Sequence, residues 1–242
     1  MKALLLGFGE IGSSVHQVLF KHHEILIHDP GKEHIVESPE GVILLLVAIP
    51  YTEKFESIVQ EWQKITNPQG TLIFSTVPIG TCSKLKACHF PIEGKHPNIA
   101  RDIIMNQNHW LGGYNAYIVQ FLNQAKLSFW QLEKPEYTEF LKLRSTAYYG
   151  VCIEFARYSK EVADKIGLDE NSIHRYDAGY NILVQERGDL RFIRPILIAP
   201  AGNIGGHCVV SNAKILDKQF PSEFLKMIYR EKENKSENSD TE

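Results

Sequence analysis

The segment Leu4–Gly12, LLLGFGEIG, decides the fold class. Its leucines continue an apolar run from Ala3, as in a strand that is buried on both faces of a parallel sheet. Three glycines in the pattern GxGxxG follow directly, and the next residues repeat apolar side chains at helical spacing. A strand, a glycine turn and a helix in this order are typical of a dinucleotide-binding βαβ unit.

Each glycine of this turn has its own role. Gly7 permits the tight turn, Gly9 lets the backbone approach a pyrophosphate, and Gly12 allows the helix to pack closely on the strand. We therefore expect the cofactor to contact the whole turn, namely Gly7, Phe8, Gly9, Glu10, Ile11 and Gly12. Asp29 ends the next apolar strand, where a carboxylate binds ribose hydroxyls and repels a 2′-phosphate. The sequence therefore favours NAD over NADP.

Strands and helices continue to alternate through the first half of the chain, which predicts an α/β Rossmann fold with a doubly wound parallel sheet over residues 1–133. Ligands of such sheets bind beyond the carboxyl ends of the strands. Pro50 and Thr76 each follow one of the apolar strands. We expect both residues to lie near the nicotinamide half of the cofactor.

The second half predicts a long connecting helix and a smaller all-helical domain over residues 134–228, followed by a charged, disordered tail over residues 229–242. The long helix opens at Pro135 and ends at Gly167. Its apolar residues recur at three- and four-residue spacings and suggest core packing: Phe140, Leu143, Ala147, Val151, Phe155 and Val162. A helix of this length suits a spine between two domains or the surface of a homodimer.

Composition limits the range of partners. The chain has 242 residues, of which 43% are hydrophobic, and a net charge of −3, which argues against nucleic acid as the main partner. No segment approaches the roughly 20 apolar residues that span a bilayer. The four cysteines lack the spacing of a metal site. We expect a cytoplasmic protein with a small-molecule substrate and without a metal, membrane or nucleic-acid partner.

Two candidate catalytic groups lie in the helical half. Lys142 and Thr146 are four residues apart and share a helix face, although a lysine at such a position is most often solvated. Cys208 follows a glycine-rich segment, and a helix that begins there would favour its thiolate form. The plainer interpretation is that Cys208 is a small buried hydrophobic residue.

Four segments together resemble one family, the UDP-glucose/GDP-mannose dehydrogenases, within the larger group related to 6-phosphogluconate dehydrogenase. They are GFGEIG (7–12), STVPIGT (75–81), KLRSTAYYGVCIEFARYSKEVADKIGLD (142–169) and GNIGGHC (202–208). The resemblance implies that Cys208 captures an aldehyde covalently between two hydride transfers to NAD. It also implies that Lys142 stabilises an alkoxide or orients a water molecule, with Thr76 near that water. We expect Gly205, Gly206 and His207 to line the substrate site.

The chain departs from the family pattern at three points. Thr146 stands where the family has Asn, and Asn212 stands where it has Asp, so a carboxylate base is missing there. The family also carries a C-terminal domain that binds the nucleotide of the substrate, and we expect no counterpart in this chain. The missing domain argues against a nucleotide-sugar substrate unless a partner chain supplies the site. We expect a small, anionic metabolite or sugar derivative as substrate, with Thr146 and Asn212 at the catalytic centre.

The segment GKHPN (94–98) resembles the histidine-proline segment of prephenate dehydrogenases. We expect His96 to act as a base or substrate anchor, and Glu93, Lys95 and Asn98 to bind the substrate. Three functions remain open at this point. They are a Cys208-dependent dehydrogenase, a two-electron hydroxyacid- or prephenate-type dehydrogenase that uses Lys142 or His96, and a non-catalytic NAD-binding protein.

Overall fold

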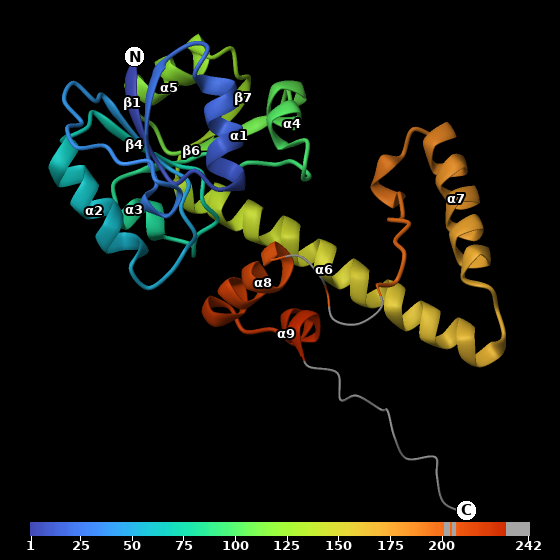
Figure 1. Ribbon diagram of the computed structural model, residues 1–242. Coiled ribbons are helices and arrows are strands. Elements are labelled where there is room, and N and C mark those ends of the chain that lie inside the picture. Colours follow the sequence, from blue (N-terminus) through green and yellow to red (C-terminus); the bar gives the residue numbers. More distant parts are fainter. Residues whose placement is uncertain (201–203, 205–206, 231–242) are drawn as a thin grey trace, which may run out of the picture. The chain divides into compact units, whose positions relative to one another are not determined.

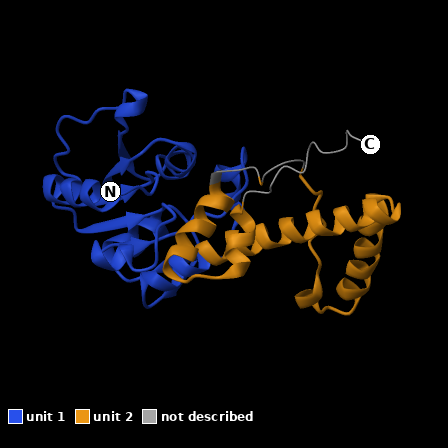
Figure 2. Ribbon diagram, turned by 90° about the horizontal axis from the view of Figure 1, so that it is seen from below, with its two compact units in different colours: residues 1–142 blue, residues 143–242 orange. Residues whose placement is uncertain are grey.

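The computed structural model describes residues 1–200, 204 and 207–230. The chain forms two compact units, Met1–Lys142 and Leu143–Glu242 (Figure 2). The boundary between them falls inside the long helix α6 (Pro135–Ile166), so the first two turns of α6 belong to the first unit. Gly205 and Gly206, and residues 231–242 of the expected tail, lie outside the described residues.

The first unit is built on a seven-stranded sheet with the strand order β2-β1-β3-β4-β5-β6-β7 (Figure 1). Its strands are β1 (Lys2–Leu6), β2 (Glu24–His28), β3 (Leu44–Val47), β4 (Gly70–Ile73), β5 (Cys88–His89), β6 (His109–Gly112) and β7 (Phe129–Leu132). Its helices before α6 are α1 (Glu10–Leu19), the 3₁₀ turn η1 (Pro30–Lys32), α2 (Phe55–Thr66), α3 (Thr81–Lys84), α4 (Ile99–Met105) and α5 (Ala116–Gln124). The predicted doubly wound α/β sheet is confirmed.

One strand pair departs from a purely parallel sheet. β5 and β6 pair in the antiparallel sense, with His89 opposite Gly112, whereas every other neighbouring pair of strands is parallel. A parallel neighbour requires a crossover that returns the chain to the amino edge of the sheet. The connection through the seven-residue α4 instead brings the chain back at the carboxyl edge. β6 and β7 therefore run opposite to the other five strands.

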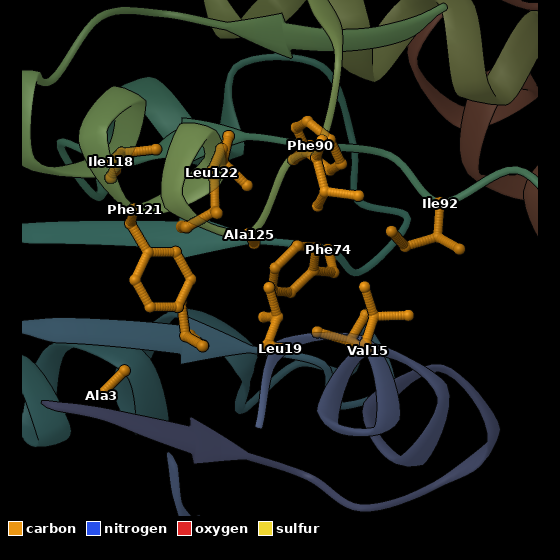
Figure 3. Close-up of a cluster of buried hydrophobic side chains, with 14 of the residues drawn as sticks. Ala3, Val15, Leu19, Phe74, Phe90, Ile92, Ile118, Phe121, Leu122 and Ala125 are labelled. Atoms are coloured by element: carbon orange, nitrogen blue, oxygen red, sulfur yellow. The ribbon is translucent and has the colours of Figure 1, made fainter. Parts of the chain in front are cut away.

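Alternating side chains of the strands form two separate cores. Ala3 and Leu5 of β1 face the cluster that α1, α4 and α5 cover, part of which Figure 3 shows. Leu4 and Leu6 face the second cluster, which α2 and α3 cover. Strand side chains alternate between the two faces, so a continuous run of apolar residues is what a sheet covered on both faces requires.

The second unit is helical, as predicted. It contains the rest of α6, α7 (Glu170–Glu186), the 3₁₀ turn η2 (Leu190–Phe192), α8 (His207–Gln219) and α9 (Glu223–Tyr229). Gly167 ends α6 at a φ of 75°, with hydrogen bonds from Gly167 N to Asp164 O and from Leu168 N to Ala163 O. This is a Schellman motif, and it confirms the predicted glycine at the end of the helix. In the described part of the chain, no helix is both long and apolar enough to cross a bilayer.

The core packing predicted along α6 is only partly correct. Leu143 and Ala147 are buried, but the exposed fractions of Phe140, Phe155 and Val162 are 46%, 66% and 38%. The sequence spacing identifies a common helix face, whereas burial depends on what packs over that face. Among the described residues, these three side chains are only partly covered.

Candidate active site

The glycine-rich turn between β1 and α1 has the geometry that its sequence predicts. Gly7 has a φ of 90°, and a Cβ there would lie 2.6 Å from the carbonyl oxygen of Ala48. A Cβ on Gly12 would overlap the carbonyl oxygen of Gly7. Both positions therefore require glycine for the fold itself, whatever the turn binds.

Gly9 differs from these two glycines because a Cβ there would meet nothing within 4 Å. Gly9 directly precedes α1, and no side chain among the described residues caps this helix. The first amides of α1, from Glu10 onward, thus have no side-chain cap among the described residues and lie at the positive end of the helix dipole. Phe8 and Ile11 are half-buried and pack against the core, so the backbone is what the turn presents. This arrangement fits a pyrophosphate group.

Asp29 lies beside this turn at the end of β2. Phe8 N donates a hydrogen bond to Asp29 Oδ2 at 2.7 Å, which fixes the carboxylate against the glycine turn. Asp29 Oδ1 accepts no hydrogen bond from the described residues. A half-buried carboxylate with one oxygen open is suited to the hydroxyl groups of a ribose.

Pro50 and Thr76 lie in neighbouring loops beyond the carboxyl ends of β3 and β4. Ser75 Oγ donates to Ile49 O at 2.7 Å and ties the two loops together. Pro50 is exposed and Thr76 is half-buried. Both residues therefore lie at the edge of the sheet where the glycine turn also lies, and their place near a nicotinamide stays a prediction.

The loop after β5 carries the predicted residues Glu93, Lys95, His96 and Asn98, and all four are exposed. His96 Nδ1 lies 2.6 Å from Glu10 Oε1, so a residue predicted to be catalytic contacts one predicted to bind the cofactor. Lys95 N donates to Asp102 Oδ2 at 2.8 Å. These contacts hold the loop at the carboxyl edge of the sheet and next to the start of α1.

Lys142 belongs to the first unit and contacts the same loop. Its Nζ donates to the carbonyl oxygen of Ile92 at 2.7 Å, and its side chain is half-buried. Lys142 is therefore not a fully solvated surface residue, which is the usual state of a lysine on an amphipathic helix. Lys142 brings a positive charge to the edge of the sheet where the predicted cofactor residues lie.

Sequence analysis missed a buried polar group beside Lys142. Glu139 is fully buried, and its carboxylate accepts hydrogen bonds from Gly80 N at 2.6 Å and from Cys82 N at 2.7 Å. Burial raises the pKa of Glu139, and these hydrogen bonds oppose the rise. A glutamate three residues before a lysine normally suggests an exposed ion pair, so the sequence contains no signal of this burial.

In the second unit, the structure joins the two residues that depart from the family pattern. Asn212 is 5% exposed on α8, and its Nδ2 donates to Thr146 Oγ1 on α6 at 3.2 Å. Cys208 lies one turn before Asn212 in α8 and is exposed, which contradicts its interpretation as a buried hydrophobic residue. His207 opens the same helix.

The four cysteines therefore differ sharply in environment. Burial raises the pKa of Cys88 to about 11, and burial together with the carboxylate of Glu139 raises the pKa of Cys82 well above its usual value. Cys152 is half-buried. Within the described residues, no group of three His, Cys, Asp or Glu side chains could hold a metal ion.

No protein-family model matches the sequence, and no curated protein matches it. Solved structures do match. UDP-D-ManNAc dehydrogenase from Pyrococcus horikoshii is 14% identical with a TM-score of 0.74, and the match covers 95% of this chain and 66% of that one. UDP-glucose dehydrogenase from Pyrobaculum islandicum is 15% identical with a TM-score of 0.71, and the match covers 95% of this chain and 67% of that one.

The chain shares the fold of these dehydrogenases. It spans about two thirds of the length of these two structures. 3-Hydroxyisobutyrate dehydrogenase from Mycobacterium tuberculosis is 11% identical with a TM-score of 0.60, and there the match covers 94% of this chain and 98% of the other. The expected fold is thus confirmed at a level of identity where the backbone is alike and most side chains differ.

Proposed function

We propose that the chain is an NAD-dependent oxidoreductase that oxidises a hydroxyl group of a small, anionic metabolite or sugar derivative. One observation carries the proposal. Among the described residues, no side chain caps α1, a Cβ on Gly9 would meet nothing within 4 Å, and Asp29 is bonded to Phe8 N of the same turn with its Oδ1 unpaired. The dehydrogenase fold of the similar structures supports it.

In this proposal each part of the first unit has a separate task. The α1 amides bind the pyrophosphate, Asp29 binds the adenosine ribose, and Thr76 and Pro50 flank the nicotinamide. NAD, when bound, supplies the hydride acceptor. The ammonium group of Lys142 stabilises the alkoxide that forms as the substrate hydroxyl loses its proton.

The cofactor assignment is tested by measuring the affinities for NAD and NADP by titration calorimetry. Wild-type protein should bind NAD and discriminate against NADP, because the carboxylate of Asp29 repels a 2′-phosphate. Asp29→Asn keeps the shape of the side chain and removes its charge, so the preference for NAD should fall about tenfold or more. A wild type that binds neither nucleotide would refute the proposal.

Cys208 is proposed to capture the aldehyde product as a thiohemiacetal, so that a second oxidation and hydrolysis give the acid. The exposure of Cys208 at the start of α8 supports this role. Cys208→Ser should stop acid formation and leave the aldehyde as the product. A variant that still forms the acid at the wild-type rate would exclude this role.

A two-electron hydroxyacid-type dehydrogenase is the second candidate, and two observations favour it. The chain spans nearly all of 3-hydroxyisobutyrate dehydrogenase, and Asn212 offers an amide in place of a carboxylate base. In that case Lys142 or His96 moves the proton. The ratio of NADH formed to substrate consumed separates the candidates, since it is two for the Cys208 scheme and one for this scheme.

We further propose that the chain forms a homodimer through its helical unit. Large side chains are exposed on α6 and α7, among them Tyr148, Tyr149, Phe155, Tyr158, Tyr176, Ile182 and Leu183. A second copy of the chain would remove this apolar surface from water, and burial of such surface is the main driving force for stable association.

A further inference from the structure

The turn that connects β4 to α3 contains Thr76, and buried side chains hold both of its ends. At the far end, the carboxylate of Glu139 accepts hydrogen bonds from the backbone N–H groups of Gly80 and Cys82. It also accepts one from the thiol of Cys82. Among the described residues, α3 has no capping side chain of its own. Glu139 of α6 therefore takes the place of that cap.

At the near end, a buried histidine holds the carbonyl group of Ser75. His89 is fully buried in β5, with Nε2 3.2 Å from Ser75 O and Nδ1 2.8 Å from Thr138 Oγ1. A carbonyl oxygen can only accept, so Nε2 carries the proton. The single hydroxyl proton of Thr138 then lies within reach of two acceptors, the unprotonated Nδ1 at 2.8 Å and Pro135 O at 2.9 Å. Burial lowers the pKa of His89 to about 3, which agrees with a neutral ring.

The groups that hold the turn come from one face of α6. Thr138 and Lys142 are four residues apart and Glu139 and Lys142 three apart, so the three side chains project from the same face of the helix. Gly112 of β6 lets this face approach the sheet, since a Cβ there would overlap Thr138 Oγ1. Thr138 acts on the turn through His89, Glu139 acts on it directly, and Lys142 holds the carbonyl group of Ile92 in the next loop.

We propose that Glu139, together with the pair Thr138–His89, is a positioning residue that fixes the Thr76 turn for the nicotinamide half of the cofactor. The inference rests on the proposed function. Glu139 touches neither cofactor nor substrate in this scheme. It sets the backbone of a turn whose middle residues face them.

The test compares two ligands, NAD and ADP-ribose, which lacks the nicotinamide. Glu139→Gln leaves one amide hydrogen of the turn facing an NH₂ group, so the turn should lose its position. We expect NAD binding to weaken about tenfold, as for the loss of one hydrogen bond to a charged group. ADP-ribose binding should change less than about twofold, because the α1 amides and Asp29 are unaffected.

Matched variants separate positioning from general damage. Glu136→Gln alters a carboxylate one turn earlier, which accepts from the side chain of Ser83, and should change neither affinity. His89→Gln retains a donor for Ser75 O and should bind NAD nearly as well as wild type, whereas His89→Leu should bind it as weakly as Glu139→Gln. If Glu139→Gln does not fold, Thr138→Val tests the same turn through His89.

The outcomes are distinct. If Glu139→Gln weakens the binding of NAD and of ADP-ribose equally, or the binding of neither, the positioning role is overturned while the proposed function stands. A wild type that binds NAD no more tightly than ADP-ribose overturns it as well, because there is then no nicotinamide contact to lose. A wild type that binds neither ligand refutes the proposed function, and the positioning role with it.

Discussion

The side-chain amide of Asn212 on α8 donates a hydrogen bond to the hydroxyl of Thr146 on α6 at 3.2 Å. Both positions differ from the family pattern, and here they form one uncharged contact in which Asn212 is 5% exposed. The hydroxyl of Thr146 donates to Leu143 O at 3.0 Å, so a carboxylate at position 212 would face an acceptor oxygen, and its charge would be buried. The two departures therefore match each other chemically.

This pairing predicts the effect of Asn212→Asp. The variant should lose about 1–3 kcal/mol of stability at pH 7.5, because burial disfavours the charged form, and should recover most of it at pH 4, where the carboxyl group is protonated. Urea unfolding at both pH values measures this. Ser211→Asp, at the exposed neighbouring position, is the control, and an equal loss in both variants would contradict the explanation.

The two glycines of the turn should behave differently when changed to alanine. Gly9→Ala should leave the unfolding free energy within about 0.5 kcal/mol of wild type, since its Cβ meets nothing, yet it should weaken NAD binding because that space is needed by the pyrophosphate. Gly12→Ala should lose at least about 1–3 kcal/mol of stability through overlap with Gly7 O. Calorimetry and thermal unfolding of both variants provide the measurement; normal NAD affinity in Gly9→Ala would exclude the proposed site.

His89 should make stability depend on acid pH. Its pKa is about 3 in the folded chain and 6.5 when unfolded, so the unfolded state binds the extra proton between these values. The stabilisation is complete above pH 6.5 and is lost as the pH falls towards 3, by up to about 1.4 kcal/mol per pH unit. Unfolding free energies of wild type and His89→Gln at several pH values should diverge over this range, and parallel curves would show that the ring is not buried and neutral.

The cysteines should react with iodoacetamide in an order set by exposure. Cys208 is exposed, whereas Cys82 and Cys88 are buried with raised pKa values, so Cys208 should be alkylated first. Peptide mass mapping after brief labelling at pH 7.5 gives the order. In Cys208→Ser the rapid phase should disappear, and labelling of Cys82 before Cys208 in wild type would contradict the structure.

The proposed homodimer predicts a change of mass in solution. Phe155→Glu places a charge within the exposed apolar side chains of α6, so it should shift the protein from dimer to monomer in light scattering at micromolar concentration. Ser145→Glu, at an exposed polar position of the same helix, should remain dimeric. A monomeric wild type would refute the dimer.

The sequence predicts the parts of the first unit that depend on local patterns. Gly7, Gly12 and Asp29 act within a short segment of chain, where a turn, a helix start and a strand end can be recognised directly. The helix from Pro135 to Gly167 is predicted for the same reason, because its ends carry specific residues.

Local sequence patterns do not predict which side chains are buried or which distant residues are in contact. Glu139 contacts an amide 59 residues earlier in the chain, and its spacing from Lys142 suggests an ordinary surface pair. The spacing of Phe140 and Phe155 correctly places them with Leu143 on one stripe of the helix. It does not predict which of the three side chains is buried. Residues whose role depends on the tertiary fold therefore required the structure.

The reversed direction of β6 and β7 determines where the long helix starts. β7 runs towards the amino edge of the other five strands, so α6 leaves the sheet in that direction, beside Gly112 and His89. Two turns later, Lys142 reaches the loop that follows the carboxyl end of β5. A chimera that exchanged this unit for one with an all-parallel sheet would release the helix at the wrong edge. Any transplant of the lysine helix into another dehydrogenase must therefore carry β6 and β7 with it.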